Sequence, residues 1–253
     1  MKNLLFILGF SVLATSFIAC NKDNDDQLMA TTDSAIKITA KATYTGNKTA
    51  KLASTLSLSS IKVNLKEIKF HYEGKDSIET HHSGDDDHDG FFDGDDNFKL
   101  KGPFEVELLN GPVDFIATDI PKEVYSDIRF KLDKSKNSAS ELFNKSIQIK
   151  GKIIDKPFVF WHFAEDDFRI DFANAADNVI IGDNLVTITF DFNLDEALSK
   201  IDLSKAKDGN GDGIIEISPL DPDGNQSIAH QFKDLIKKSC HIKHGNDDSP
   251  GHD

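Results

Sequence analysis

A stretch of acidic residues at 85–96, DDDHDGFFDGDD, has the composition of a cation site. Its aspartates follow the pattern D-x-D-x-D-G-x-x-D-x-x-D, in which alternate side chains of a tightly turned loop point inward and the glycine permits the turn. Hard carboxylate oxygens suit calcium. The predicted ligands are Asp85, Asp87, Asp89, Asp93 and Asp96, together with the backbone carbonyl of Phe91. The alternative is a solvated acidic tip between two strands that binds nothing.

A second loop, DGNGDGIIE at 208–216, repeats this pattern in part. Its predicted ligands are Asp208, Asn210, Asp212 and Glu216, with the backbone carbonyl of Ile214. Pro219 stands where the loop should close, so the closing ligand is Asp221, a water molecule or nothing. Asp223 and Asn225 either extend the site or cap the helix that follows. Both loops resemble EF-hand calcium loops, and the first also resembles dockerin loops and thrombospondin-type aspartate repeats, which implies calcium as the bound ion.

Histidines beside the first loop offer a different metal chemistry. His81, His82 and His88 carry imidazole nitrogens that suit zinc, nickel or copper. The neighbouring carboxylates favour calcium, the harder ion, so transition-metal capture is an alternative function. A further cluster lies near the C-terminus and consists of Cys240, His241, His244 and His252. It falls in a tail rich in Gly, Pro and Asp, and we expect residues 241–253 to be disordered.

Catalytic motifs are missing from the sequence. It contains no G-x-S-x-G, no H-E-x-x-H, no Walker loop and no dinucleotide-binding glycine turn. We therefore predict a non-catalytic protein, with an extracellular hydrolase as a second alternative. Trp161 is interpreted as a core or sandwich-edge aromatic rather than a sugar platform, and His162 as a satisfied strand residue rather than a ligand.

The N-terminal residues indicate export and a lipid anchor. One lysine precedes an apolar run that ends at Cys20, which is the plan of a secretory signal peptide at 1–19. The segment FIAC resembles the lipobox of bacterial lipoproteins, although Phe17 departs from the usual leucine. The acidic segment NKDNDD resembles the tether of Bacteroidota lipoproteins, which implies a lipidated Cys20, a flexible tether at 20–34, and attachment to the outer membrane with the chain exposed at the surface.

Charge narrows the choice of partners. The chain carries 29 Lys and Arg against 43 Asp and Glu, a formal charge of −14. Such a balance excludes nucleic acid as a partner, because phosphate binding requires basic surfaces. The expected partners are the membrane, through the anchor, and an unknown extracellular ligand, either a glycan or a protein.

Hydrophobic periodicity predicts the elements that must hold these loops. Period-two alternation indicates strands at 35–44, 61–72, 104–109, 113–118, 128–133, 146–154, 157–163, 168–172 and 185–192. Helical spacing appears at 194–201 and, with a clear apolar stripe, at 225–239. The apolar residues from Ile61 to Leu65 are odd-numbered, whereas those from Ile68 to Tyr72 are even-numbered, so we predict a β-bulge near Lys66.

These elements predict a mainly β fold. We expect an antiparallel β-sandwich domain at 35–200, followed at 201–240 by the second acidic loop and a short C-terminal amphipathic helix packed on it. The segments IKVNLKEIKFHYEG and FEVELLNGPVDFIATDIPKEVYSDIRFKLD resemble an uncharacterised β-domain family of exported bacterial proteins, a domain of unknown function. The resemblance covers roughly residues 35–160 and implies a surface β-sandwich without known catalytic residues.

Overall fold

The computed structural model describes residues 33–46, 56–72, 92–93, 97–165, 167–171 and 178–246. These residues belong to one compact unit, Thr31–Asp253. The predicted signal peptide and residues 20–32 of the predicted tether lie outside them. The last two residues of the predicted tether, Asp33 and Ser34, belong instead to the first strand. Within the described ranges, no helix combines the length and the apolar character needed to cross a membrane.

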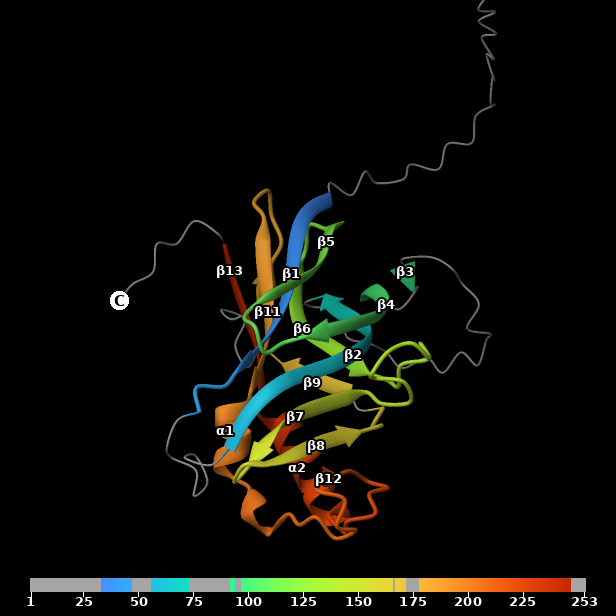
Figure 1. Cartoon of the computed structure of the whole chain (residues 1–253). Coiled ribbons are helices and arrows are strands. Elements are labelled where there is room, and N and C mark those ends of the chain that lie inside the picture. The colour runs from blue at the N-terminus through green and yellow to red at the C-terminus, as the bar shows by residue number, and fades with distance from the viewer. Residues whose placement is uncertain are drawn as a thin grey trace, which may run out of the picture. The chain divides into compact units, whose positions relative to one another are not determined.

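Most described residues form strands (Figure 1). The strands are β1 (Asp33–Thr43), β2 (Leu56–Tyr72), β3 (Phe92–Asp93), β4 (Asn97–Glu107), β5 (Val113–Pro121), β6 (Val124–Leu132), β7 (Ile147–Ile153), β8 (Lys156–His162), β9 (Asp167–Asp171), β10 (Val179–Ile180), β11 (Val186–Asn193), β12 (Ile215–Ile217) and β13 (Cys240–Asn246). The helices are α1 (Leu194–Ser199), the short 3-10 turn η2 (Leu203–Lys205) and α2 (Gln226–Lys238).

The strands form two sheets. The smaller sheet has the order β13-β11-β1-β5, and the larger has the order β10-β6-β2-β7-β8-β12, with β4 beside β2, β3 beside β4 and β9 beside β6. The predicted mainly β, sandwich-like fold is therefore confirmed. The prediction of a purely antiparallel arrangement is wrong, because β1 pairs with β11, and β8 with β12, in parallel. The segments that separate these partners in the chain are long enough to return each second strand in the same direction.

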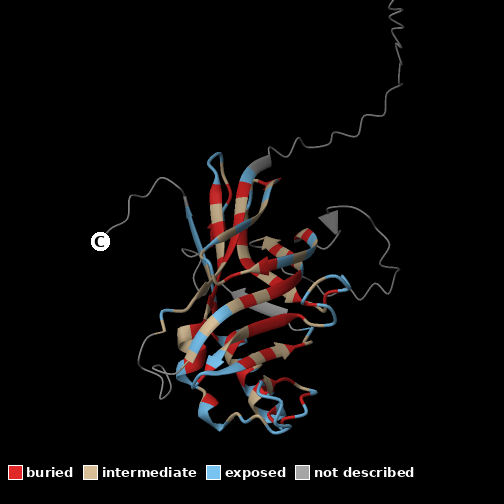
Figure 2. Ribbon diagram, in the orientation of Figure 1, coloured by how far each residue is buried: buried red, intermediate tan, exposed pale blue. Residues whose placement is uncertain are grey.

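The long strand β2 carries the predicted irregularity. Its pairing with both β4 and β6 shifts register between Leu65 and Glu67, so the β-bulge near Lys66 is confirmed. The shift keeps Leu65 and Ile68 buried on either side of it. Figure 2 shows buried residues recurring along β2 and the neighbouring strands. A bulge also redirects the side chains around it, which matters for the pocket described below.

Aromatic rings join the two sheets. Phe130 of β6 lies 4.7 Å from Phe190 and 5.8 Å from Phe192, ring centre to ring centre, and both partners belong to β11 in the other sheet. Phe232 of α2 packs against Phe160 of β8 at 4.8 Å. The predicted amphipathic helix is thus confirmed as a cover for the larger sheet. Burial of such rings contributes most of the stability of a β-sandwich core.

The C-terminal part of the chain differs from the prediction in two ways. Residues 241–246 were expected in a disordered tail, but they belong to β13, which pairs with β11 along its length. Cys240 is buried and Ile242 packs against the core, so two apolar side chains on one face fix the strand. Residues 201–240 do not simply pack on the sandwich. Their β12 joins the larger sheet beside β8, because Ile215 and Ile217 are buried.

Candidate functional site

The second acidic loop leads directly into β12, and its first side chains turn back onto the loop. The Asp208 carboxylate accepts hydrogen bonds from the amides of Gly211 and Gly213, at 2.8 and 3.1 Å. Asn210 Oδ1 accepts from the amide of Asp212 at 2.9 Å, and the Asp212 carboxylate accepts from the amide of Ile214 at 2.9 Å. These oxygens therefore gather around a tight turn, as the sequence pattern predicts.

Glu216, the next predicted ligand, is directed elsewhere. Its carboxylate accepts the indole N–H of Trp161 at 2.9 Å and the hydroxyl of Ser218 at 3.2 Å. Across the part of the chain that the structure describes, no three His, Cys, Asp or Glu side chains gather as a metal site. Glu216 thus links the acidic loop to β8, and calcium at this loop stays a prediction.

The remaining polar residues of this segment anchor the loop. Asp223 is buried, and its carboxylate accepts from the amides of Gly209, Asn210 and Glu216 at 3.1, 3.1 and 2.7 Å. Asp221 is also buried and accepts from the amides of Ser218 and Asn225 at 3.0 Å each. Backbone N–H groups satisfy both carboxylates, so these aspartates hold the loop together by hydrogen bonds within the protein.

Asn225 occupies the N-cap position of α2 without making a side-chain cap bond. Its amide nitrogen donates instead to the carbonyls of Lys207 and Glu216, at 2.8 and 2.7 Å. The side chain thus ties the two ends of the acidic loop together at its base. Sequence spacing alone could not separate this role from helix capping.

Most of the other predicted metal ligands lie outside the residues that the structure describes. Residues outside the described ranges are Asp85, Asp87, Asp89, Phe91, Asp96, His81, His82, His88 and His252. The backbone of Asp93 lies in β3, opposite Asn97. Cys240 and His241 are adjacent in β13, so their side chains point to opposite faces of the sheet. His241 Nε2 lies 3.1 Å from Glu196 Oε2, whereas burial and the nearby Asp191 raise the pKa of the Cys240 thiol. His244 lies three positions after His241 in β13.

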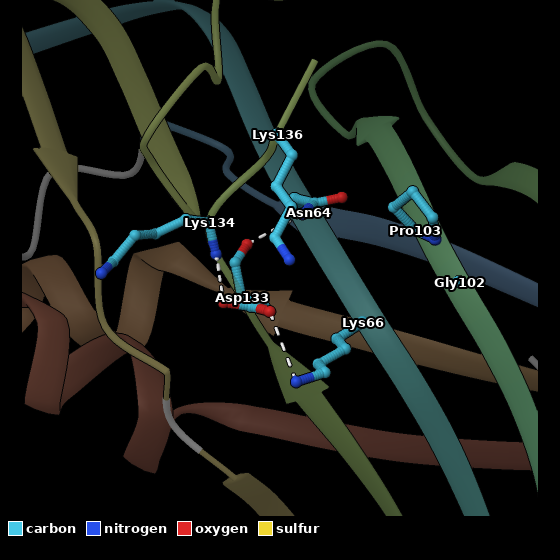
Figure 3. A pocket seen from close by; sticks show the side chains of 7 residues that line it. All are labelled: Asn64, Lys66, Gly102, Pro103, Asp133, Lys134 and Lys136. Carbon is cyan, nitrogen blue, oxygen red and sulfur yellow. Dashed lines mark hydrogen bonds and ion pairs between the residues drawn. The ribbon is translucent and has the colours of Figure 1, made fainter. Parts of the chain in front are cut away.

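A pocket of about 210 Å³ opens at the bulge of β2 (Figure 3). We call it the bulge pocket, and its walls are Asn64, Lys66, Gly102, Pro103, Asp133, Lys134 and Lys136. Gly102 lets β4 approach the bulge, because a Cβ there would lie 2.5 Å from the carbonyl oxygen of Leu65. A register shift in β2 and a close glycine in β4 therefore create the space together.

Asn64 is the buried polar residue of the bulge pocket. It is 2 % exposed, and its Nδ2 donates to the carbonyl of Asp133 at 2.8 Å. Its Oδ1 is buried and has no hydrogen-bond partner among the residues that the structure describes. An unpaired buried acceptor costs about 1–3 kcal/mol, and a donor recovers this free energy only when the residues that cover Oδ1 move aside.

The charges of the bulge pocket are mainly positive. Lys66 lies 3.5 Å from Asp133, and the amide of Lys134 donates to the same carboxylate at 2.7 Å (Figure 3). Lys136 is exposed and forms no ion pair with any residue in the described ranges. The other nearby lysines are paired: Lys134 Nζ lies 3.5 Å from Glu165 Oε1, and Lys62 and Lys150 each approach Glu141 to 2.6 Å.

The hydrogen bonds from Lys150 and Lys62 hold the pKa of Glu141 at about 2, well below the usual value for a glutamate. This carboxylate is therefore ionised throughout the physiological pH range and keeps both lysines engaged. Lys136 has no such partner among the described residues, which leaves its ammonium group available to an anionic ligand.

A second pocket, of about 270 Å³, adjoins the first. We call it the aromatic pocket, and it is lined by Lys134, Asn144, Trp161, Phe163 and Leu220. The rings of Trp161 and Phe163 lie 6.1 Å apart. Lys134 Nζ lies 5.5 Å from the centre of Phe163, and Lys145 Nζ lies 5.6 Å from that of Trp161. The floor of this pocket is thus apolar, and one lysine lies over the face of each ring.

Trp161 faces away from the core. Its neighbours in β8, Phe160 and His162, are buried, whereas Trp161 is half-buried on the opposite side of the strand. Trp161 is therefore not a core residue, and its interpretation as a sandwich-edge aromatic rather than a sugar platform stays a prediction. The interpretation of His162 as a satisfied strand residue is confirmed, since its Nδ1 accepts from the amide of Ala164 at 2.9 Å and its Nε2 lies 3.4 Å from His230 Nδ1.

One loop carries lysines of both pockets. Ser135 is buried, its hydroxyl bonds to Glu105, and its amide donates to the carbonyl of Lys145 at 3.0 Å. The amide of Asn144 donates in return to the carbonyl of Ser135 at 2.9 Å. Lys134 lines both pockets, and Figure 3 shows its side chain pointing out of the bulge pocket. The two pockets therefore form one surface, which we call the Lys134 surface.

Sequence reasoning missed the Lys134 surface. Its signals were the bulge at Lys66 and the aromatic Trp161, and neither reveals which lysines of another loop will surround them. Comparison with known proteins adds no relative: no family model matches the chain, and no curated protein or solved structure matches it. The resemblance to a β-domain family of exported proteins stays a prediction.

Proposed function

We propose that this chain is a non-catalytic binding module of a surface lipoprotein, held at the outer membrane by a lipid on Cys20. The binding site is the Lys134 surface. The observation that supports it is the buried Oδ1 of Asn64 in a pocket beside Lys136, since neither group has a partner within the described ranges. Native proteins leave few buried acceptors unsatisfied, and a bound ligand is one way to satisfy such a group.

The rest of the Lys134 surface supports the same function. Its aromatic pocket offers an apolar floor, and its bulge pocket offers hydrogen-bond donors and one unmet acceptor. A few polar groups around an apolar floor are typical of ligand pockets. Trp161 is held in place by Glu216 at 2.9 Å, so the floor is oriented before a ligand arrives.

An array of defined glycans and peptides, probed with the full chain, tests this function. We expect binding to at least one probe, and we expect the Trp161→Ala and Lys136→Ala variants to lose it. Lys205→Ala is the matched control, because Lys205 is exposed, pairs only loosely with Asp202 at 3.9 Å and lines neither pocket. Retained binding in both site variants, or no binding to any probe, would contradict the proposal.

We also propose that calcium stabilises the acidic loops. The supporting observation is the turn in which Asp208, Asn210 and Asp212 direct their oxygens around the loop backbone. A ligand that binds only the folded state adds about 2.7 kcal/mol at a hundredfold excess over Kd. For a chain of this size such a gain raises the melting temperature by roughly 5–10 °C.

Thermal unfolding of the full chain in calcium and then in chelator measures this effect. A double variant, Asp208→Asn with Asp212→Asn, removes two charged predicted ligands from the second loop. A second double variant, Asp87→Asn with Asp89→Asn, does the same in the first loop. Each double variant should reduce the rise in melting temperature that calcium causes. Asp195→Asn, which lies outside both loops, should leave that rise unchanged. An identical melting temperature in calcium and chelator would remove calcium from the account.

A further inference from the structure

We propose that the outer face of the larger sheet holds a second binding site, which takes the phosphoryl group of a phosphate monoester. The site is a pocket of about 150 Å³ lined by Glu67, Lys69, Arg129, Phe130 and Lys131. We call it the β2–β6 pocket, because its residues belong to these two neighbouring strands. None of the five lines the bulge pocket or the aromatic pocket, so this site is separate from the Lys134 surface.

Strand register places basic side chains side by side on this face. Lys69 of β2 lies opposite Lys99 of β4 on one side and opposite Arg129 of β6 on the other. The neighbours of Lys69 along the strand, Ile68 and Phe70, are buried, so Lys69 points away from the core. Like charges directly opposite each other on neighbouring strands repel. An anion bound beside this row would therefore relieve a repulsion that the sheet carries.

The carboxylates on this face leave an excess of positive charge. Glu67 lies 3.7 Å from Lys69, too far for a hydrogen bond, and Asp127 accepts from Nε of Arg129 at 3.2 Å. The β2–β6 pocket itself is lined by three cations and one carboxylate, a formal excess of two positive charges. The chain as a whole carries a formal charge of −14. The pocket therefore has the opposite sign to the protein.

Donors at the pocket remain accessible to a ligand. Arg129 donates through Nε, and its two terminal nitrogens make no hydrogen bond to any residue of the described ranges. Lys131 forms no ion pair within those ranges. The side chains of Lys69 and Arg129 are each 35 % exposed, so a solute reaches them without displacing other residues.

A phosphate monoester matches these donors. At pH 7 its phosphoryl group carries a charge of about −1.5 to −2 and presents three acceptor oxygens. This charge offsets the excess of the pocket, and the oxygens accept from the arginine fork and the two ammonium groups. A carboxylate offers one charge and two oxygens, so it satisfies the pocket less completely. Pockets for whole ligands measure about 300 Å³ or more, so only the phosphoryl end enters this one.

Calorimetric titration of the full chain with glycerol 3-phosphate tests the proposal. Glycerate is the matched probe, because it carries a carboxylate in place of the phosphoryl group on a three-carbon backbone. A chelator is present so that calcium cannot bridge the phosphate to an acidic loop. At low salt, where charges are least screened, we expect saturable binding of glycerol 3-phosphate. Glycerate should bind about tenfold or more weakly.

Variants assign the contacts. Lys131→Gln should weaken the binding of glycerol 3-phosphate about tenfold, and Arg129→Lys, which keeps the charge but removes the fork, should do the same. Glu67→Gln should strengthen it about fivefold, because a carboxylate at the pocket no longer repels the ligand. A gain in affinity cannot result from a damaged fold. Lys205→Gln is the charge control and should change nothing.

Vesicles distinguish a soluble phosphate monoester from a lipid head group. Vesicles of phosphatidylcholine with phosphatidic acid carry the monoester at their surface, and phosphatidylcholine alone is the control. The apolar N-terminal segment is the same in every variant, so weaker binding of Lys131→Gln reports the pocket. If the full chain binds these vesicles through Lys131 but not glycerol 3-phosphate, the source is a lipid. Binding of glycerol 3-phosphate, with equal vesicle binding by the full chain and Lys131→Gln, assigns a soluble source.

Three results would overturn the proposal. Equal affinity for glycerate and glycerol 3-phosphate would mean that the pocket attracts any anion. Phosphate binding that is unchanged in both Lys131→Gln and Arg129→Lys would place the ligand elsewhere. Failure of both glycerol 3-phosphate and the phosphatidic acid vesicles to bind would remove the site. None of these results bears on the Lys134 surface, because its test uses other variants and other probes.

Discussion

Phe130→Ala is expected to lower the free energy of unfolding by about 3–5 kcal/mol, the range for deleting a buried aromatic ring. Phe130 is 1 % exposed and touches Phe190 and Phe192 across the two sheets. Its loss leaves a cavity at the joint of the sandwich. Urea unfolding followed by circular dichroism measures the change.

Ile180→Ala is the matched control for this prediction. Ile180 is 66 % exposed, so removing its side chain should change the free energy of unfolding by less than about 0.5 kcal/mol. If Phe130→Ala were no more destabilising than Ile180→Ala, the packing of the two sheets against each other would be wrong.

Asp223→Ala is expected to destabilise the protein by about 2–4 kcal/mol, because three backbone amides lose a charged acceptor. Gly209 and Asn210 are exposed, so their amides can bind water in the variant. The expected loss of stability is therefore smaller than the sum for three buried hydrogen bonds. The amide of Glu216 loses the shortest of the three bonds, at 2.7 Å. Asp212→Ala, at the exposed tip of the same loop, is the control and should cost less than about 1 kcal/mol.

Trp161 reports the local consequence of this change. It is the only tryptophan of the chain, and its indole N–H is bound to Glu216. Release of Glu216 in Asp223→Ala should expose the indole and move its emission to longer wavelength. An unchanged spectrum together with wild-type stability would mean that Asp223 does not hold the loop.

Strand positions could be predicted from the sequence because the apolar side chains alternate with a period of two. The same parity placed the bulge near Lys66. The pairing of β1 with β11, and of β8 with β12, could not be predicted, because alternation shows which face of a strand is buried but not its neighbour. β13 was missed because its polar residues, His241 and Lys243, resemble those of a solvated tail.

The candidate site shows a similar limit. Spacing identified an acidic loop but could not distinguish carboxylates that face a cation from those that accept backbone amides. Asp223 has the second role, since amides surround it in the interior. Asp208 and Asp212 accept backbone amides as well, from Gly211, Gly213 and Ile214 in the turn itself. The lysines around Asn64 come from separate elements, and only the folded chain brings them together.

The central claim is that the Lys134 surface binds a ligand. The most direct measurement compares the full chain with its Trp161→Ala and Lys136→Ala variants on the array. The comparison is then repeated as a titration with the probe that binds most strongly. The account predicts saturable binding by the full chain and by Lys205→Ala, with a loss of about tenfold or more in each site variant. Equal affinity in all four proteins would place the ligand elsewhere and contradict the account.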